Sequence, residues 1–191
     1  DDLIQALLAV KELNPIFSTV FVADATLSRL NEKGEISSLA DREYMQEVRK
    51  TKETVISREI LISQATKKPS LMIATPVKVP GAPERYLGIS VNIDNLQGIV
   101  AQSKKSDSNY SFAFDGKNGL IFAHPVAAYI GSLKLLNPDE KDKSLVAPEL
   151  QEMAREAAAG QSGSQIYDFN GVRIIAAYTN IPGTSMGVAT R

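Results

Sequence analysis

The chain has 191 residues, 43% of them hydrophobic and 23% charged, which is enough for one large domain or two small modules with an ordinary core. This composition excludes an intrinsically disordered chain, and the formal net charge of -1 gives no general attraction to nucleic acid or anionic lipid. The sequence has no cysteine and a single histidine, His124. Disulfides, cysteine nucleophiles and cysteine zinc sites are therefore excluded, and a Ser-His-Asp triad would have to use that imidazole.

The N-terminal residues follow a helical pattern. Apolar side chains such as Leu3 and Leu7 recur at helical spacing over residues 1–13, and Pro15 lies just past the expected end. No stretch approaches the roughly 18 apolar residues that a membrane span requires, and no signal peptide is visible. Because a natural chain rarely begins with Asp-Asp in mid-helix, we expect this sequence to be part of a longer protein.

The first half of the chain combines strands with two helices. Residues 17–23, rich in β-branched and aromatic side chains, predict a strand, and a polar loop is expected from there to Gly34. A helix is predicted over 39–51, with Ser38 as its N-cap and Asp41 as the reciprocal capping partner. Three strands and a linking helix follow, with a hairpin turn at Pro80-Gly81-Ala82-Pro83. We place them at 54–62, 70–79, 85–93 and 94–103.

The second half partly repeats this order. Strands are predicted at 110–115 and 120–123, on either side of a turn, and a helix at 148–159 has Pro148 in its first turn and Gly160 just past its end. Three strands close the chain, the first two joined by the tight-turn pair Asn170-Gly171. They are placed at 163–168, 172–179 and 186–190. Sequential hairpins beside helices predict an α+β fold rather than a doubly wound parallel sheet.

Several local strings, in their order and spacing, resemble a known family. The first half contains Phe21-Val22-Ala23-Asp24, Asp41-Arg42-Glu43-Tyr44-Met45, Ile62-Ser63-Gln64-Ala65-Thr66-Lys67-Lys68-Pro69, Ala74-Thr75-Pro76-Val77 and Leu87-Gly88-Ile89-Ser90-Val91-Asn92-Ile93-Asp94-Asn95-Leu96. The second half contains Asp115-Gly116-Lys117-Asn118-Gly119-Leu120-Ile121-Phe122-Ala123-His124-Pro125 and Ala177-Tyr178-Thr179-Asn180-Ile181-Pro182-Gly183-Thr184. Together they resemble the double Cache domain, in which two PAS-like modules follow a long N-terminal helix. The likeness covers essentially the whole chain.

This resemblance implies the domain organisation. Residues 1–16 would be the end of the long helix, 17–103 a membrane-distal ligand-binding module with its linking helix, and 104–191 a membrane-proximal module. The chain would then be the extracytoplasmic sensing domain of a bacterial transmembrane receptor, and not an enzyme. A chemoreceptor is the first expectation. The alternatives are a histidine kinase, a cyclase, or a periplasmic scaffold module without a direct ligand.

The resemblance also implies partners. The domain would bind a small molecule, either a carboxylate or another metabolite, and would dimerise weakly through its N-terminal helix. The full-length protein would be anchored in the membrane, and no nucleic acid, cofactor or metal is expected. A hydrolase is a third class of function, but one histidine and no cysteine offer no convincing nucleophile and base.

Arg42 and Tyr44 are the first candidates for ligand contacts. Two positions apart on a helix, they point about 200° away from each other, unless one of them sits at the helix start. Arg42 can clamp a carboxylate with two parallel hydrogen bonds, and Tyr44 can stack on a ligand or hydrogen-bond to it. In the alternative, Arg42 pairs with Asp41 or Glu43 on the surface and Tyr44 is half-buried core. The family resemblance favours the pocket.

The ammonium anchor of the amino-acid-binding members has no counterpart here. In those members, as the resemblance implies, an Asp on the third strand takes the ammonium of the ligand. The matching position is Ser90, and a neutral hydroxyl in that place loses several kcal/mol of charge compensation. An α-amino acid is therefore a doubtful ligand, and a carboxylate, a sugar-like or a heterocyclic ligand each fits as well.

Further candidate wall residues come from the strands of the first module. Strand alternation puts the polar residues of 85–93 on one face, and that face is either exposed to solvent or part of a wet pocket. The candidates are Phe21, Ser57, Ser63, Tyr86, Ser90 and Asn92. His124 has no acidic or histidine neighbour in sequence that would make it catalytic or metal-binding, so a structural role is expected.

Overall fold

The computed structural model describes residues 2–78 and 80–191. It divides into two compact units, which we call the N-terminal unit and the C-terminal unit. The N-terminal unit runs to Ser57 and resumes over Leu61–Asn92, and the C-terminal unit comprises Arg58–Ile60 and Ile93–Arg191. The linking helix, α3 (Ile93–Gln102), therefore groups with the second unit. Across the described residues no helix is both long and apolar enough to cross a bilayer.

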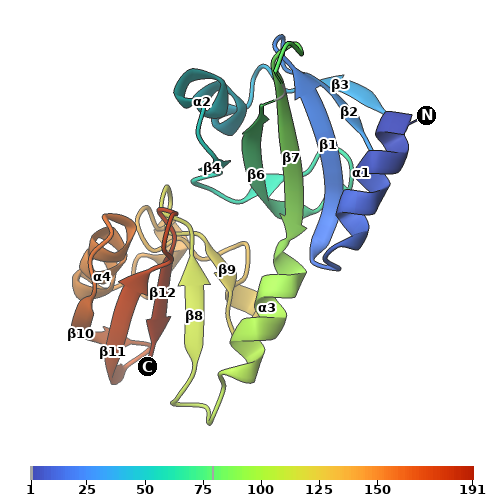
Figure 1. Ribbon diagram of the computed structural model, residues 1–191. Helices are drawn as coiled ribbons and strands as arrows, with labels where there is room; N and C mark the ends of the chain where they lie inside the picture. Colours follow the sequence, from blue (N-terminus) through green and yellow to red (C-terminus); the bar gives the residue numbers. More distant parts are fainter. Residues whose placement is uncertain (1, 79) are drawn as a thin grey trace. The chain divides into compact units, whose positions relative to one another are not determined.

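An antiparallel sheet forms the centre of the N-terminal unit (Figure 1). Its strands are β1 (Phe17–Asp24), β2 (Ser28–Asn31), β3 (Ile36–Ser38), β4 (Val55–Ile56), β5 (Leu61–Ile62), β6 (Pro69–Val77) and β7 (Arg85–Asn92). The order is β3-β2-β1-β7-β6-β4, and β5 also pairs with β6. On one face α1 (Asp2–Glu12) places Leu7 against Val20 and Val22 of β1, and α2 (Glu43–Thr51) covers the other.

Two of the strand predictions for this unit are wrong. The loop expected before Gly34 holds the β2–β3 hairpin, in which the Asn31 side chain accepts the N–H groups of Lys33 and Glu35. Strands of three or four mostly polar residues are too short for a hydrophobic alternation to be detected. The run 54–62 is two two-residue strands, β4 and β5, rather than one.

The start of α2 was also predicted wrongly. The helix begins at Glu43, its N-cap is Arg42, and Ser38 is the last residue of β3. The chain between β3 and α2 is held away from helical geometry because Leu39 is buried in the core and donates its N–H to the carbonyl of Leu27 at 2.9 Å. The tertiary contact therefore overrides the local capping signal.

The polar face of β7 is not exposed to solvent. Tyr86, Gly88 and Ser90 are all buried and face the core beneath α2. Gly88 lies opposite Phe21 across the β1–β7 pair, and a Cβ on Gly88 would lie 2.0 Å from the Phe21 ring. The ring of Phe21 thus occupies the space that any side chain at position 88 would need.

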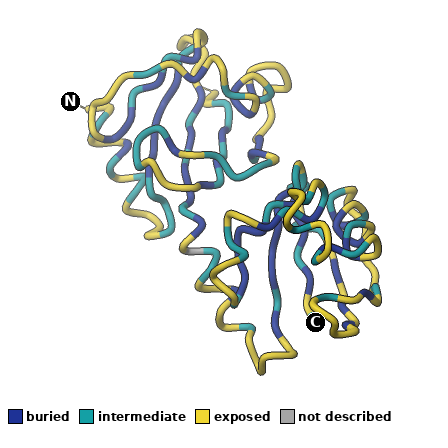
Figure 2. Tube along the Cα trace, turned by 180° about the vertical axis from the view of Figure 1, so that it is seen from behind, coloured by how far each residue is buried: buried dark blue, intermediate teal, exposed yellow. Residues whose placement is uncertain are grey.

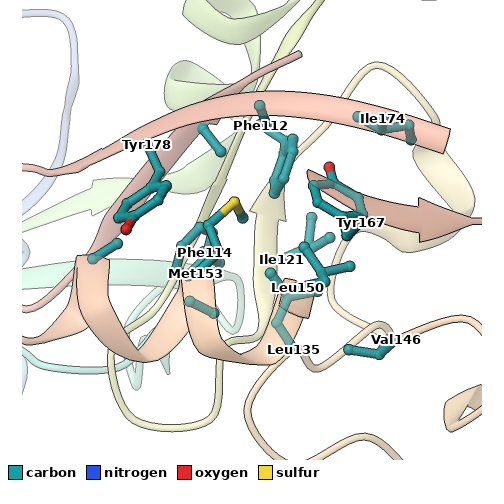
Figure 3. Packing of buried hydrophobic residues seen from close by; sticks show 14 of the residues in the cluster. Phe112, Phe114, Ile121, Leu135, Val146, Leu150, Met153, Tyr167, Ile174 and Tyr178 are labelled. Carbon is teal, nitrogen blue, oxygen red and sulfur yellow. The ribbon is translucent and has the colours of Figure 1, made fainter. Parts of the chain in front are cut away.

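The C-terminal unit packs an antiparallel sheet against a helix. Its elements are β8 (Ser111–Phe114), β9 (Ile121–Ala123), the short 3-10 helices Ala127–Tyr129 and Glu140–Asp142, α4 (Pro148–Ala158), β10 (Gly163–Phe169), β11 (Val172–Asn180) and β12 (Gly187–Thr190). The strand order is β10-β11-β12-β8-β9. Figure 3 shows Leu150 and Met153 of α4 pointing toward Phe112 and Phe114 of β8.

Several local signals in this half are confirmed. Pro148 opens α4, Gly160 follows it with φ +86°, and Asn170-Gly171 forms the β10–β11 turn with both residues at positive φ. In both units the buried residues follow the central strands, and the exposed ones gather at the turns (Figure 2). The α+β prediction, with antiparallel sheets in both halves, is confirmed.

The side chain of Gln97 links the helix α3 to the end of β9. The Gln97 amide accepts the N–H of His124 at 2.8 Å and donates to its carbonyl at 2.6 Å. It therefore pairs with both backbone groups of His124, as a neighbouring strand would. This pair of bonds holds the residue that directly follows β9.

Gly88→Ala should lower the free energy of unfolding by about 1–3 kcal/mol, because the added methyl group collides with the buried Phe21 ring. Chemical denaturation followed by circular dichroism measures the change. Gly98→Ala in α3 is the control, since its Cβ meets nothing within 4 Å and a helical Ala is favoured over Gly. Equal stability of the two variants would contradict the close contact of Phe21 and Gly88.

Candidate ligand-binding site

A hollow of about 220 Å³, counted to its open mouth, lies beside the start of α2 in the N-terminal unit. Leu39 and Met72 are among its apolar lining residues. Its polar lining side chains are Arg29, Arg42, Tyr44, Ser63 and Gln64. No Asp or Glu lines it. The hollow is therefore a small site with two cations and several hydrogen-bonding groups.

Arg29 is a buried cation without an anionic partner. It comes from β2, is 4% exposed, and its Nε donates to Ser37 Oγ at 2.6 Å, while its guanidinium carbon lies 5.7 Å from the centre of the Phe21 ring. No carboxylate of the described residues lies within 4.0 Å of it. Burial lowers the pKa of Arg29 from its ordinary value, and the positive charge of Arg42 acts in the same direction, while Tyr44, Glu35 and Glu32 oppose the shift. An anion beside the Arg29 guanidinium would oppose both effects and favour its charged form.

Arg42 reaches the same hollow from the N-cap of α2. At that position the helical geometry has not yet begun, so Arg42 and Tyr44 can both line the hollow despite being two residues apart. The Nε of Arg42 lies 3.9 Å from Asp41, whose side chain is 74% exposed. Because exposed pairs at this distance contribute little, the guanidinium is available to a ligand.

Tyr44 places an unpaired hydroxyl in this site. The residue is 3% exposed, and its hydroxyl has no hydrogen-bond partner in the described chain. Burial raises the pKa of Tyr44 to about 12, although Arg42 and Arg29 oppose the shift. The phenol is therefore protonated at neutral pH and can donate a hydrogen bond to an anion.

Among the remaining predicted residues, Ser63 lines the hollow and Phe21 lies beneath Arg29. The others do not line it. Ser57 accepts the N–H of Met72 at 3.1 Å, and the Tyr86 hydroxyl accepts from Lys52 at 2.9 Å. Their buried polar groups are thus engaged in holding the fold.

The two remaining residues lie on β7. Ser90 is fully buried and its hydroxyl is 2.9 Å from that of Ser18, and Asn92 is half-buried at the end of the strand. Two polar lining residues, Arg29 and Gln64, were missed from the sequence, as were the apolar lining residues Leu39, Leu61, Ile62 and Met72. Arg29 lies in the region taken for a polar loop, where nothing marked it. Gln64 directly follows Ser63, so only the family resemblance of that segment could have suggested it.

His124 occupies a different environment in the C-terminal unit. It is 4% exposed, its Nδ1 accepts the N–H of Val126 at 2.8 Å, and the rings of Tyr110 and Tyr129 each lie 5.0 Å away. Burial lowers the pKa of His124 to about 4. Within residues 2–78 and 80–191, no group of three or more metal-ligating side chains is found.

No protein-family model matches this chain, and no functionally curated protein matches it either. Solved structures do match. The extracellular domain of mmHK1S-Z2, described as a candidate histidine kinase, has a TM-score of 0.74 at 14% identity, covering 99% of this chain and 80% of that one. The chain has the tandem Cache fold.

Chemoreceptor domains share the Cache fold with this chain. The ligand-binding domain of Pseudomonas aeruginosa PctB in complex with L-Arg has a TM-score of 0.69 at 16% identity, covering 99% of this chain and 76% of that one. The sensory domain of Campylobacter jejuni Tlp3 with isoleucine bound has a TM-score of 0.64 at 20% identity, with 97% and 69% covered. These neighbours are ligand-binding sensor domains, not enzymes. At such identities the likeness establishes the fold.

Tyr44→Phe should leave the free energy of unfolding unchanged or raise it by about 1 kcal/mol, because a buried hydroxyl without a partner is a cost to the folded state. Thermal unfolding without added ligand measures this. Tyr178→Phe is the matched control, because its hydroxyl donates to Glu156 and its loss should lower stability by about 1 kcal/mol. A similar loss in both variants would show that the Tyr44 hydroxyl has a partner in the empty protein.

His124 should make stability fall in mild acid. Its folded pKa of about 4 lies below the unfolded value of 6.5, so its contribution is complete above pH 6.5 and is lost as the pH falls toward 4. The loss is on the order of 3 kcal/mol. Denaturation of the protein and of His124→Gln at several pH values isolates the contribution of His124 to the free energy of unfolding. An imidazole that titrates near pH 6.5 by NMR, where it is the sole histidine signal, would contradict the burial.

Proposed function

We propose that this chain is the extracytoplasmic small-molecule sensing domain of a bacterial transmembrane receptor, with a chemoreceptor as the favoured type and a sensor histidine kinase as the second. The Cache fold, shared with extracellular domains of both kinds, supports this proposal. We further propose that the hollow beside α2 binds the ligand, and that the ligand carries a carboxylate. The residues Arg29, Arg42 and Tyr44 carry that part of the proposal.

The charges in the hollow favour an anion. Two guanidinium groups contribute positive charge to one small space, and none of its lining residues is acidic. The carboxylates near Arg29 are committed elsewhere, because Glu32 binds Lys11 and the N–H of Val20, and Glu35 accepts from Asn31. A bound carboxylate would receive charge-assisted hydrogen bonds from the arginines and one from the Tyr44 hydroxyl.

The same lining argues against an α-amino acid in this hollow. PctB and Tlp3 are solved with L-Arg and isoleucine, which carry an α-ammonium beside the carboxylate. Here no acidic side chain lines the hollow to receive an ammonium, and Ser90 is occupied by Ser18. An ammonium beside Arg29 and Arg42 would add to their repulsion. We therefore propose an organic acid without an amino group, small enough for a space of about 220 Å³.

The proposed signal is a shift between two conformations. A ligand between the two arginines would draw the start of α2 toward β2, because Arg42 precedes the helix and Arg29 lies on the strand. The preference of the ligand for the closed form need only be about 1–3 kcal/mol to signal. We propose that weak dimerisation along α1 and anchoring in the membrane pass this shift to the cell.

A thermal-shift screen of small organic acids should find a ligand. At a concentration of about 100 Kd a hit stabilises the domain by about 2.7 kcal/mol. Calorimetric titration of the hit should then show about 10- to 100-fold weaker binding for Arg29→Gln and for Arg42→Ala, because each removes a charge-assisted hydrogen bond. Arg49→Ala, an exposed residue of the same helix, is the control and should bind normally.

Two outcomes would overturn the site. The first is a hit whose affinity is unchanged in both Arg29→Gln and Arg42→Ala. The second is a hit among amino acids that binds more tightly than its deaminated analogue. If no organic acid, sugar or amino acid stabilises the domain, the alternative of a scaffold module without a direct ligand takes the place of this proposal.

A further inference from the structure

The C-terminal unit has a hollow of its own, which the proposed sensing site does not use. It has about 290 Å³ of empty space counted to its opening, and its walls combine aromatic rings with aliphatic side chains. The rings are those of Tyr110, Phe112, Tyr129, Tyr167 and Phe169, and the aliphatic residues are Ile121, Leu133, Leu135 and Leu150. His124 and Arg191 supply the nitrogen groups of its lining. No Asp or Glu lines it.

An open groove adjoins this hollow. The groove has about 770 Å³ of empty space including its open side, and Tyr110, Tyr129, Phe169 and Arg191 line both spaces. The only carboxylate in its lining, Asp107, is paired with Lys104 at 2.7 Å. The groove and the aromatic hollow therefore adjoin along these four shared residues.

Polar groups in the hollow lack partners. Tyr110, Tyr167 and His124 are 6%, 4% and 4% exposed, yet neither phenol hydroxyl nor the His124 Nε2 makes a hydrogen bond within the described part of the chain. The Nε of Arg191 is buried and has no partner either. Of these atoms only the Arg191 Nε is itself buried, and because buried polar groups are nearly always paired, it indicates a missing partner, while the phenol hydroxyls and His124 Nε2 open onto the hollow beside it.

These groups are mainly donors. His124 Nδ1 accepts the N–H of Val126, so the neutral imidazole carries its proton on Nε2. Arg191 can only donate, and the two phenols can donate as well. Arg191 also brings a positive charge, with its guanidinium carbon 4.4 Å from the centre of the Tyr110 ring. The missing partner is therefore an acceptor, and an anionic one fits the charge.

The walls define the shape of that partner. The ring of His124 meets those of Tyr110 and Tyr129 edge to face, at interplanar angles of 75° and 83°, and Tyr129 meets Phe169 at 86°. Ring faces and edges set nearly at right angles accept a flat ring by stacking and edge contacts. On the side of the space that these rings form, they favour a flat aromatic partner over a branched aliphatic one.

We propose that the aromatic hollow of the C-terminal unit is a second ligand site, and that it takes a planar aromatic carboxylate. Its carboxylate would lie at Arg191, where the hollow meets the groove, and would face His124 and the two tyrosines, while its ring would lie in the groove against Tyr129 and Phe169. The site differs from the first in its shape requirement, because the hollow beside α2 has no aromatic wall apart from Tyr44. The receptor would then respond to two chemical classes through two sites.

Benzoate is the test probe, with calorimetry and NMR of the single histidine as readouts. Benzoate should bind the domain and shift the ring signals of His124. Arg191→Gln should weaken binding about 10-fold or more, and Tyr167→Phe, which keeps the ring, about 3- to 10-fold. Arg173→Gln on β11 is the matched control, since Arg173 is exposed and lines neither space.

The variants also separate the two sites. Benzoate binding that survives Arg42→Ala and is lost in Arg191→Gln supports the second site, whatever the result for the first. Binding lost in Arg42→Ala but intact in Arg191→Gln and Tyr167→Phe overturns it, and so does absence of benzoate binding. Equal affinity for benzoate and cyclohexanecarboxylate would overturn the requirement for a flat ring.

Discussion

The contact between Phe21 and Gly88 sets the place of the aromatic ring on which Arg29 of the proposed ligand site lies. Because residue 88 has no side chain, the Phe21 ring can lie over the β1–β7 pair, and the guanidinium of Arg29 can lie near that ring. Arg29 makes no ion pair within 4.0 Å among the described residues, so the ring and the Ser37 hydroxyl are its contacts in the core. The ring thus allows a cation to stay buried without neutralising it. The place of the Arg29 guanidinium in the hollow therefore depends on a glycine of β7, which lies two strands away from β2.

The two hollows show a common electrostatic plan with different walls. Each has arginine in its lining, neither has an acidic lining residue among the described residues, and each has a buried polar atom without a partner, the Tyr44 hydroxyl in one and the Arg191 Nε in the other. In the N-terminal unit the arginines come from β2 and the start of α2, so a ligand would bridge two elements. In the C-terminal unit aromatic rings surround the polar groups. The first arrangement suits closure around a compact ion, and the second suits selection by shape.

The sequence predicted the regular elements better than the site. Long strands and capped helices such as α4 have strong local signals, and Asn170-Gly171 requires the positive φ angles that it adopts. The start of α2 could not be predicted locally, because the burial of Leu39 decides it. Arg29 could not be predicted for a similar reason. Its strand, β2, has only four residues and is ordered by its pairing with β1, which no local pattern indicates. Arg42 and Tyr44 were predicted from the family resemblance. Helical periodicity alone would place their side chains on opposite sides of the helix, and so predicted that they would not share a hollow.

The Gln97–His124 pair has an evolutionary consequence. A primary amide is the side-chain group that offers a donor and an acceptor side by side, as one edge of a peptide does. A carboxylate of the same length would set an oxygen against the carbonyl of His124, and an aliphatic residue would leave both backbone groups unpaired. Position 97 should therefore tolerate less variation among homologues than its place on a half-exposed helix suggests. Because the partners are backbone groups, this constraint holds whatever side chain stands at the residue after β9.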